Sequence, residues 1–248
     1  MNAAVWAEAM KLRRSTVGLV ASAAIVGGIL AICGGMLVAA GSGSDVVAAK
    51  LGPYADASWW GLLGTCAQVT GAAAFVGFGV VLSWMFGREF AEGTITGLFG
   101  LPVTLTHTAM AKVTVYLAWA GLVAVALTAG EVVLGLALGL GAPDEAAWLG
   151  VARQFALVLL TAVIALPVAW VTTLTRSLLA GVGTVIGLVA VAQIVVIGGA
   201  GGWVPLAAPT LWALEMDVTP AQLLLSVVWG ALGILATLIA WKRLQLDR

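Results

Sequence analysis

Residues 60–86 read WGLLGTCAQVTGAAAFVGFGVVLSWMF and are the clearest indication of the fold class. This stretch contains no charged residue, and it is longer than the roughly 20 apolar residues that a helix needs to cross a bilayer core of about 30 Å. Comparable apolar runs occur on both sides of it. Together they predict six transmembrane helices, at residues 16–40, 60–86, 113–140, 151–174, 178–201 and 221–241.

The composition of the whole chain agrees with a membrane protein. Of its 248 residues 62% are hydrophobic and 9% are charged, whereas a soluble domain carries about 25% charged residues. The formal net charge is zero, so the chain lacks the basic field that attracts nucleic acids. We therefore expect an all-α integral membrane protein in which residues 1–248 form one transmembrane domain.

The positions of lysine and arginine predict the orientation. Both chain ends and alternate connections hold nine of these residues: Lys11, Arg13, Arg14, Arg88, Lys112, Arg176, Lys242, Arg243 and Arg248. The other connections hold only Lys50 and Arg153. Cationic segments stay on the cytoplasmic side of a membrane. Both termini are therefore expected in the cytoplasm.

Residues 2–15 have the spacing of an amphipathic helix that lies in the membrane interface. One stripe consists of Val5, Trp6, Ala9, Met10 and Leu12, and the opposite face carries Glu8, Lys11 and Arg14. The alternative is a solvated basic start of the chain.

The connection at residues 87–112 is expected to contain a short helix. Gly93 suits the left-handed end of one helix, and Thr94 suits the cap of the next. Pro102 disfavours helix at the residue before it, which predicts a helix at residues 94–101. Its apolar side chains, Leu98, Phe99 and Leu101, would lie outside the bilayer and would need a protein partner.

Several residues of this connection resemble the signature of ABC-2 type permeases. The resemblance rests on EFAEGT at positions 89–94, on Leu98, on the Leu-Pro-Val run at 101–103 and on the basic Lys112. Residues 7–15, AEAMKLRRS, are similar to the interfacial helix of the same family. Many members carry an arginine shortly after the Pro-Val pair, where this chain has Thr104.

The resemblance implies a half-transporter that pairs with a second permease subunit and binds two copies of a separate ATPase. The coupling helix between the second and third spans would dock on that ATPase. The implied coupling residues are Glu89, Glu92, Gly93, Thr94, Leu98, Phe99, Leu101 and Pro102. The chain has no G-x-x-x-x-G-K-[ST] phosphate loop, so ATP and Mg²⁺ are expected in the partner and no cofactor in this chain.

Three polar side chains from three predicted spans fall at a similar depth. Gln68, Glu131 and Gln193 each lie about 12–15 Å below the same membrane boundary at 1.5 Å per residue. They predict a shared polar spot on the path of the substrate. The alternative is a protonated Glu131 that serves packing alone. Cys33 and Cys66 are interpreted as buried thiols, with a disulfide between neighbouring helices as the alternative.

The connection before the last span is too apolar for a water-exposed loop and too broken for a span. Glycines and prolines interrupt it, which predicts a re-entrant pair of short helices at residues 203–214. Trp203, Pro205, Pro209 and Trp212 are the residues expected to form an extracellular gate.

The function that these features predict is that of the permease subunit of an ATP-driven exporter in a bacterial plasma membrane. Its substrate is expected to be amphipathic, such as an antibiotic, a peptide or a lipid. One rival is a proton-coupled secondary transporter that uses Glu131. The other is a membrane enzyme, which a single histidine and the lack of a nucleophile–base pair disfavour.

Overall fold

The computed structural model describes residues 2–100 and 102–245, and all regular structure in this part of the chain is helical. Six helical segments are long and apolar enough to cross a membrane. They are Thr16–Gly41, Trp59–Ala91, Leu105–Ala137, Glu145–Thr175, Leu178–Ile197 and Pro220–Lys242. The expectation of an all-helical protein with six candidate membrane-spanning helices is confirmed.

Two of the six spans consist of more than one helix. The first comprises α2 (Thr16–Ala23), the π-helical turn η1 (Ala24–Gly28) and α3 (Ile29–Gly41), and the fourth comprises α8 (Glu145–Ala165) and α9 (Pro167–Thr175). The others are α5 (Trp59–Ala91), α7 (Leu105–Ala137), α10 (Leu178–Ile197) and α12 (Pro220–Lys242). The short elements are α1 (Asn2–Arg13), α4 (Asp45–Leu51), η2 (Gly52–Tyr54), α6 (Ile95–Leu98), η3 (Gly201–Trp203) and α11 (Ala208–Ala213).

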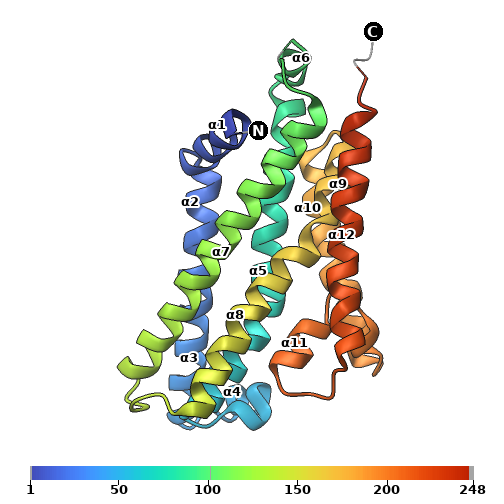
Figure 1. The fold of residues 1–248 in the computed structure, drawn as a ribbon. Helices are drawn as coiled ribbons and strands as arrows, with labels where there is room; N and C mark the ends of the chain where they lie inside the picture. Colours follow the sequence, from blue (N-terminus) through green and yellow to red (C-terminus); the bar gives the residue numbers. More distant parts are fainter. Residues whose placement is uncertain (1, 101, 246–248) are drawn as a thin grey trace.

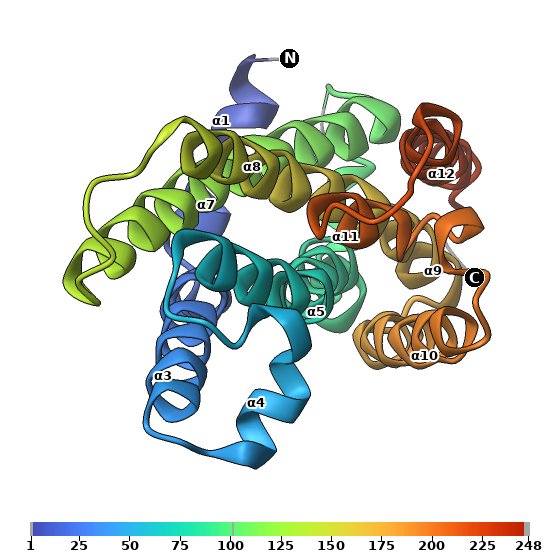
Figure 2. The ribbon, with the colours of Figure 1, turned by 90° about the horizontal axis from the view of Figure 1, so that it is seen from below.

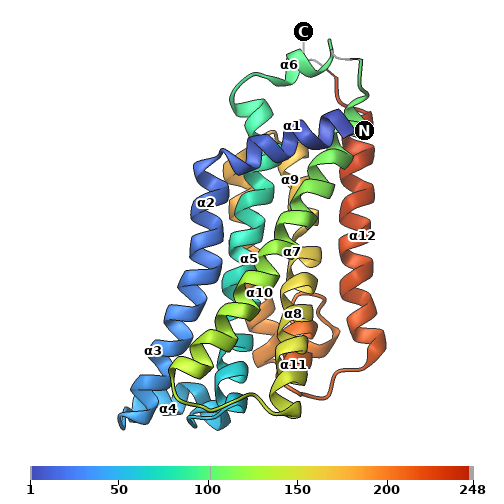
Figure 3. The ribbon, with the colours of Figure 1, turned by 60° about the vertical axis from the view of Figure 1, so that its left-hand side comes forward.

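The two ends of the bundle differ in the short elements that they carry. Helices α1 and α6 lie at the same end as the last turn of α12, and α4 and α11 lie toward the opposite end (Figures 1 and 3). We call these the α6 end and the α4 end. At the α6 end, α1 runs across the bundle instead of along it (Figure 3).

Every one of the six spans begins with a side-chain cap. The first N–H groups of a helix have no partner within the helix, and a side-chain oxygen at the N-cap position satisfies one of them. In this bundle the caps accept hydrogen bonds from the backbone N–H three residues later. The capping residues are Ser15, Ser58, Thr104, Asp144, Ser177 and Thr219.

Helix α5 lies in the middle of the bundle, where α3, α8, α9, α10 and α11 pack around it (Figure 2). Over half of its most apolar window, 56%, is buried, against 11% for α10. Helix α10 therefore leaves most of its apolar surface for lipid or for a partner.

The fourth span bends where α8 meets α9, because Pro167 cannot donate the backbone hydrogen bond that would continue the helix. Helix α12 packs against this bend at Gly233. A Cβ at that position would come within 2.6 Å of the Pro167 nitrogen, so only glycine allows this close approach.

The third span begins earlier than residue 113, where the sequence placed it. Helix α7 starts at Leu105, because Thr104 caps it and Lys112 continues the helix without a break. The connection between α5 and α7 is correspondingly shorter than the expected 87–112. Within it, α6 covers only residues 95–98 instead of 94–101, since Gly97 and Gly100 are poor helix formers. Leu101 lies outside the described residues.

Candidate functional site

A cluster of buried charges lies at the α6 end, centred on Lys112 of α7. The side chain of Lys112 is fully buried. Its Nζ donates hydrogen bonds to Oε2 of Glu8 at 2.8 Å, to Oε1 of Glu89 at 3.0 Å and to the carbonyl oxygen of Met85 at 2.9 Å. These three acceptors match the three donors of an ammonium group. The buried cation is therefore fully satisfied.

Lys11 of α1 completes the cluster from its more exposed side. Its Nζ donates to Glu8 Oε1 at 2.7 Å and to Glu89 Oε1 at 2.9 Å. Burial alone would lower the pKa of Lys11, but the hydrogen bonds and the charges of Glu8 and Glu89 raise it above its ordinary value. Two lysines and two carboxylates thus form a charge-neutral group.

The cluster joins helices that are far apart in sequence. Glu8 and Lys11 belong to α1, Glu89 to the last turns of α5, and Lys112 to α7. The hydroxyl of Thr94, directly before α6, donates to Glu89 Oε2 at 2.6 Å. Removing one partner of a buried ion pair typically costs about 3–5 kcal/mol, because the other charge stays buried and unpaired. The cluster therefore fixes α1, α5, α7 and the start of α6 to one another.

The sequence pattern placed Glu8 on the water-facing side of α1, and this prediction is wrong. Glu8 is 4% exposed and turns into the protein, whereas Trp6 is 68% exposed. Lys112 is the physical reason, because a buried lysine draws carboxylates toward it. Lys112 itself lies inside α7, so it is not one of the loop charges that set the orientation.

Helix α6 presents only part of its apolar surface. Ile95 and Leu98 pack against the core of the chain itself, while Phe99, directly after the helix, is 40% exposed. Gly93 adopts the left-handed conformation (φ 68°) that ends α5, and Pro102 is exposed. Among the expected coupling residues within the described ranges, Phe99 is thus the large apolar side chain that stays available.

Glu92 plays a different part from Glu89. Its carboxylate lies at the surface and forms an ion pair with Arg88 at 3.1 Å, one helical turn away. Arg88 also lies over the ring of Trp84, 4.7 Å from the ring centroid. Exposed pairs of this kind contribute little to stability, so Glu89 and not Glu92 anchors the end of α5.

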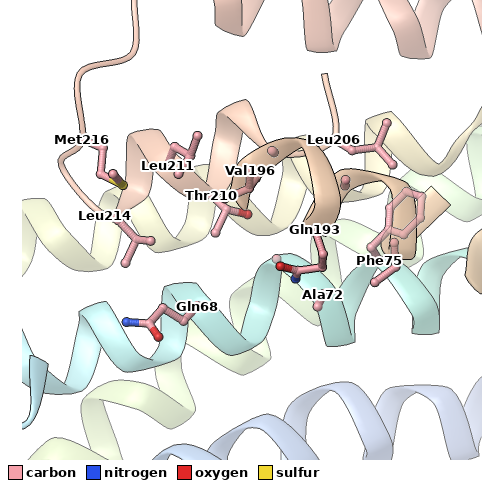
Figure 4. A pocket seen from close by; sticks show the side chains of 14 residues that line it. Gln68, Ala72, Phe75, Gln193, Val196, Leu206, Thr210, Leu211, Leu214 and Met216 are labelled. Atoms are coloured by element: carbon pink, nitrogen blue, oxygen red, sulfur yellow. The ribbon is translucent and has the colours of Figure 1, made fainter. Parts of the chain in front are cut away.

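The three polar groups expected at one depth do not meet. Gln68 of α5 and Gln193 of α10 line a cavity of about 430 Å³ between these helices and the segment that contains α11 (Figure 4). Glu131 of α7 lies elsewhere, beside Gln154 and Cys66. The depth below the membrane boundary, counted in residues along each span, is similar for all three. It does not indicate in which direction each side chain points from its helix. The expectation of one shared polar spot is wrong.

The cavity has mostly apolar walls. Phe75, Leu206, Leu211 and Met216 lie around it, together with the hydroxyl-bearing side chain of Thr210 (Figure 4). The two glutamine amides and the Thr210 hydroxyl are the side-chain groups in this lining that carry both hydrogen-bond donors and acceptors. An occupant with an apolar body and a few polar atoms would match such walls.

Glu131 is fully buried, and among the described residues neither of its carboxyl oxygens has a hydrogen-bond partner. Gln154 donates instead to the hydroxyl of Thr70 at 2.8 Å. Cys33 and Cys66 are buried free thiols. An unpaired carboxylate at such a position would be strongly destabilising, which favours the neutral acid.

The residues expected to form an outer gate are spread along the connection between α10 and α12. Trp203 in η3 is 66% exposed, while Pro209 in α11 is buried. The carbonyl oxygen of Pro205 accepts a hydrogen bond from Ser226 of α12 at 2.8 Å. Trp212 is half-buried in α11. The segment is therefore anchored to the bundle at Pro205 and Pro209, while Trp203 stays exposed.

Sequence reasoning missed Glu8 and Gln154 as members of buried polar contacts. A signal existed for Glu8, because a lysine inside an apolar helix requires a carboxylate partner. The partner lies 104 residues away in the chain, and no local pattern identifies it.

Comparison with known families identifies the class of protein. The model of the ABC-2 family transporter protein matches residues 4–193, a region that contains the charge cluster, α6 and both cavity glutamines. The chain therefore belongs to the ABC-2 transporter family, whose members are membrane components of transporters and typically work with ATPase subunits. No curated protein and no solved structure matches the chain.

Proposed function

We propose that this protein is the permease subunit of an ATP-driven exporter. Its α6 end faces the cytoplasm and its α4 end faces outward, in a bacterial plasma membrane. A separate ATPase, present in two copies, supplies ATP and Mg²⁺ binding. Membership of the ABC-2 family and the charge pattern of the connections support this orientation and this partnership.

The observation that carries the proposal is the charge cluster around Lys112. A force applied at α6 reaches Glu89 through the 2.6 Å hydrogen bond from Thr94. Glu89 is paired with Lys112 and Lys11, so α7 and α1 must follow any shift of the end of α5. Rigid elements that share discrete, fully satisfied contacts are the physical means by which such shifts are transmitted.

The exposed side chain of Phe99 is the proposed contact with the ATPase. It follows a short helix that projects from the bundle (Figure 3). Ile95 and Leu98 fix that helix to the chain's own core, so the projection is supported from below. A partner that covers Phe99 would move α6 and the cluster together.

A second permease subunit is proposed to pack against α10 and the first span. Apart from adjacent residues and the backbone of the same helix, no described atom lies within 4 Å of the position that a Cβ would take at Gly183 or Gly187 of α10, or at Gly27 or Gly28 of η1. Small residues on open helix faces allow close helix–helix approach within a membrane. The two permease subunits, identical or different, would then meet on these faces.

The proposed substrate is amphipathic, and the cavity around Gln68 and Gln193 is its proposed contact. The cavity opens next to α10, the least buried span. The segment from η3 to α11 borders it and forms the proposed outer gate. Alternating access would consist of exposing this cavity first to the inner and then to the outer side.

The role of Phe99 can be tested by isolating the tagged chain from its native membrane. We expect an ATPase subunit to co-purify with the wild-type chain and to be lost with Phe99→Asp. The matched control is Val46→Asp in α4, at the opposite end, where Val46 is 69% exposed. Equal retention of the ATPase by both variants would contradict a contact at Phe99.

A proton-coupled transporter is the second candidate, and the buried, unpartnered Glu131 is the observation that favours it. The cavity described above does not include Glu131 in its lining. Purified protein that transports substrate under a proton gradient, without an ATPase, would favour this second candidate. Proton-driven transport that is unchanged in Glu131→Gln would exclude Glu131 as the proton carrier and would contradict this second candidate function.

A further inference from the structure

A second cavity, larger in volume than the first, lies at the α6 end beside the charge cluster. It is a groove of about 800 Å³ between α1, the beginning of α2 and the last turns of α5. Three basic side chains line it, Lys11, Arg14 and Arg88, against the single carboxylate of Glu92. The proposed function gives this groove no role.

Most of these charges are already paired within the protein. Lys11 shares the carboxylates of Glu8 and Glu89, and Arg88 pairs with Glu92. Arg14 is exposed and forms no ion pair with any residue in the described ranges 2–100 and 102–245. The groove thus presents one positive charge that no side chain within the described residues neutralises.

Arg88 adds a second, partly exposed guanidinium-bearing side chain to the same groove. Its Nη2 atom bonds to Glu92, and its guanidinium lies over the ring of Trp84. Its Nε–H is buried and has no acceptor among the described residues. That nitrogen is therefore out of reach of a molecule in the groove, and Arg88 can meet an anionic group only through the exposed part of its side chain.

The apolar part of the groove continues into the membrane. Val17, one of the first residues of the first span, belongs to its lining. One turn beyond it on the same face of α2, Val20 is 63% exposed. Trp6 and Trp84 add aromatic rings to the lining, and tryptophan is typical of the level of the lipid headgroups. The groove therefore combines a cationic rim with an apolar track that begins at the hydrocarbon boundary.

We propose that this groove binds one phospholipid of net negative charge, such as phosphatidylglycerol. The phosphate lies between the side chains of Arg14 and Arg88, and one acyl chain follows Val17 and Val20 along α2. An arginine guanidinium suits a phosphate because it offers several donors in a planar arrangement. A bound lipid would hold α1 against the bundle at the point where the cluster leaves Lys11 partly exposed.

The test uses the full-length protein in detergent and native mass spectrometry. It is titrated separately with dioctanoyl phosphatidylglycerol, dioctanoyl phosphatidylcholine and inorganic phosphate. Since a basic residue near an anionic lipid contributes about fivefold in affinity, we expect phosphatidylglycerol to bind about fivefold more tightly than phosphatidylcholine. Inorganic phosphate should bind far more weakly, because it has no acyl chain.

The decisive variants are neighbours in sequence. Arg14→Gln should remove the preference for phosphatidylglycerol, and Arg13→Gln should keep it, because Arg13 is equally exposed but does not line the groove. Both residues are at the surface, and unchanged unfolding midpoints without lipid would show that both variants fold. Equal affinity for the two lipids, equal loss in both variants or competition by inorganic phosphate would each overturn the proposal.

Discussion

Two regions of this bundle bury acidic side chains, and they do so by opposite means. At the α6 end, Glu8 and Glu89 are almost fully buried, and each forms ion pairs with Lys11 and Lys112. In the middle of the bundle, Glu131 is fully buried and has no hydrogen-bond partner among the described residues. The first site holds ionised groups in place, and the second favours a neutral acid.

The difference shows which buried acids hold helices together. An ionised pair in a poorly solvated place is costly to break, so its partners are fixed relative to one another. A neutral, unpartnered acid imposes no such constraint on its neighbours. We therefore expect mutations at the α6 end to affect stability and coupling together, and mutations at Glu131 to affect neither strongly.

The largest effect is expected from Lys112→Met. It leaves the carboxylates of Glu8 and Glu89 with only Lys11 as a counter-charge, and breaking a buried pair in this way costs about 3–5 kcal/mol. The measurement is the free energy of unfolding in detergent. The double variant Lys112→Met/Glu8→Gln should lose less free energy of unfolding than the sum of the losses in the two single variants. Strict additivity would show that the two side chains do not interact.

A smaller loss is expected from Glu89→Gln, with Glu92→Gln as the matched control. Glu89 is 2% exposed and accepts hydrogen bonds from two lysines and Thr94, so its loss should cost about 1.5–3 kcal/mol. Glu92 lies at the surface, and an exposed pair contributes about 0–1 kcal/mol. Thermal unfolding of both variants provides the comparison. A loss at Glu92 as large as that at Glu89 would contradict the distinction between them.

Glu131→Gln should change stability by less than about 1 kcal/mol, because an amide and a neutral acid have nearly the same shape and polarity. The same unfolding assay applies. A loss comparable with that of Lys112→Met would mean that Glu131 is ionised and paired, and the contrast between the two regions would disappear.

The smallest effect concerns pH and Lys11. Its pKa is raised in the folded protein, so folding is favoured as long as the lysine is protonated in both states. This contribution is complete below the pKa of the unfolded chain and is lost as pH rises through the higher folded value. The unfolding midpoint should therefore fall more at strongly alkaline pH for the wild type than for Lys11→Gln. Parallel pH curves would show that Lys11 does not contribute.

The spans were predictable from sequence because membrane insertion requires a local property, a long apolar run. All six are found, and their boundaries differ from the structure mainly where a cap such as Thr104 starts a helix before the apolar run begins. The turn at Gly93 was predictable for the same local reason, since its left-handed conformation favours glycine.

The candidate site was only partly predictable, because pairing across the bundle is not a local property. Glu89 and Thr94 were singled out by a motif, but their link to Lys112 and Glu8 depends on how α1 crosses the bundle. The predicted grouping of Glu131 with Gln68 and Gln193 is wrong for a related reason. The depth of a residue in the membrane does not determine how its helix is rotated about its own axis. Gln154 lies on a further helix, and its position beside Glu131 depends on the packing of α8 against α7.

The most direct test of the central claim asks whether movement at α6 reaches the cavity through Glu89. A cysteine introduced as Gln193→Cys in the cavity reports its accessibility to a membrane-impermeant maleimide, since Cys33 and Cys66 are both buried. The complex with its ATPase is labelled with and without ATP. We predict that ATP changes the labelling rate in the otherwise wild-type and Glu92→Gln backgrounds but not with Glu89→Gln, while ATP hydrolysis continues in all three. A full ATP-dependent change with Glu89→Gln would contradict the claim that the charge cluster transmits motion from α6 to the bundle.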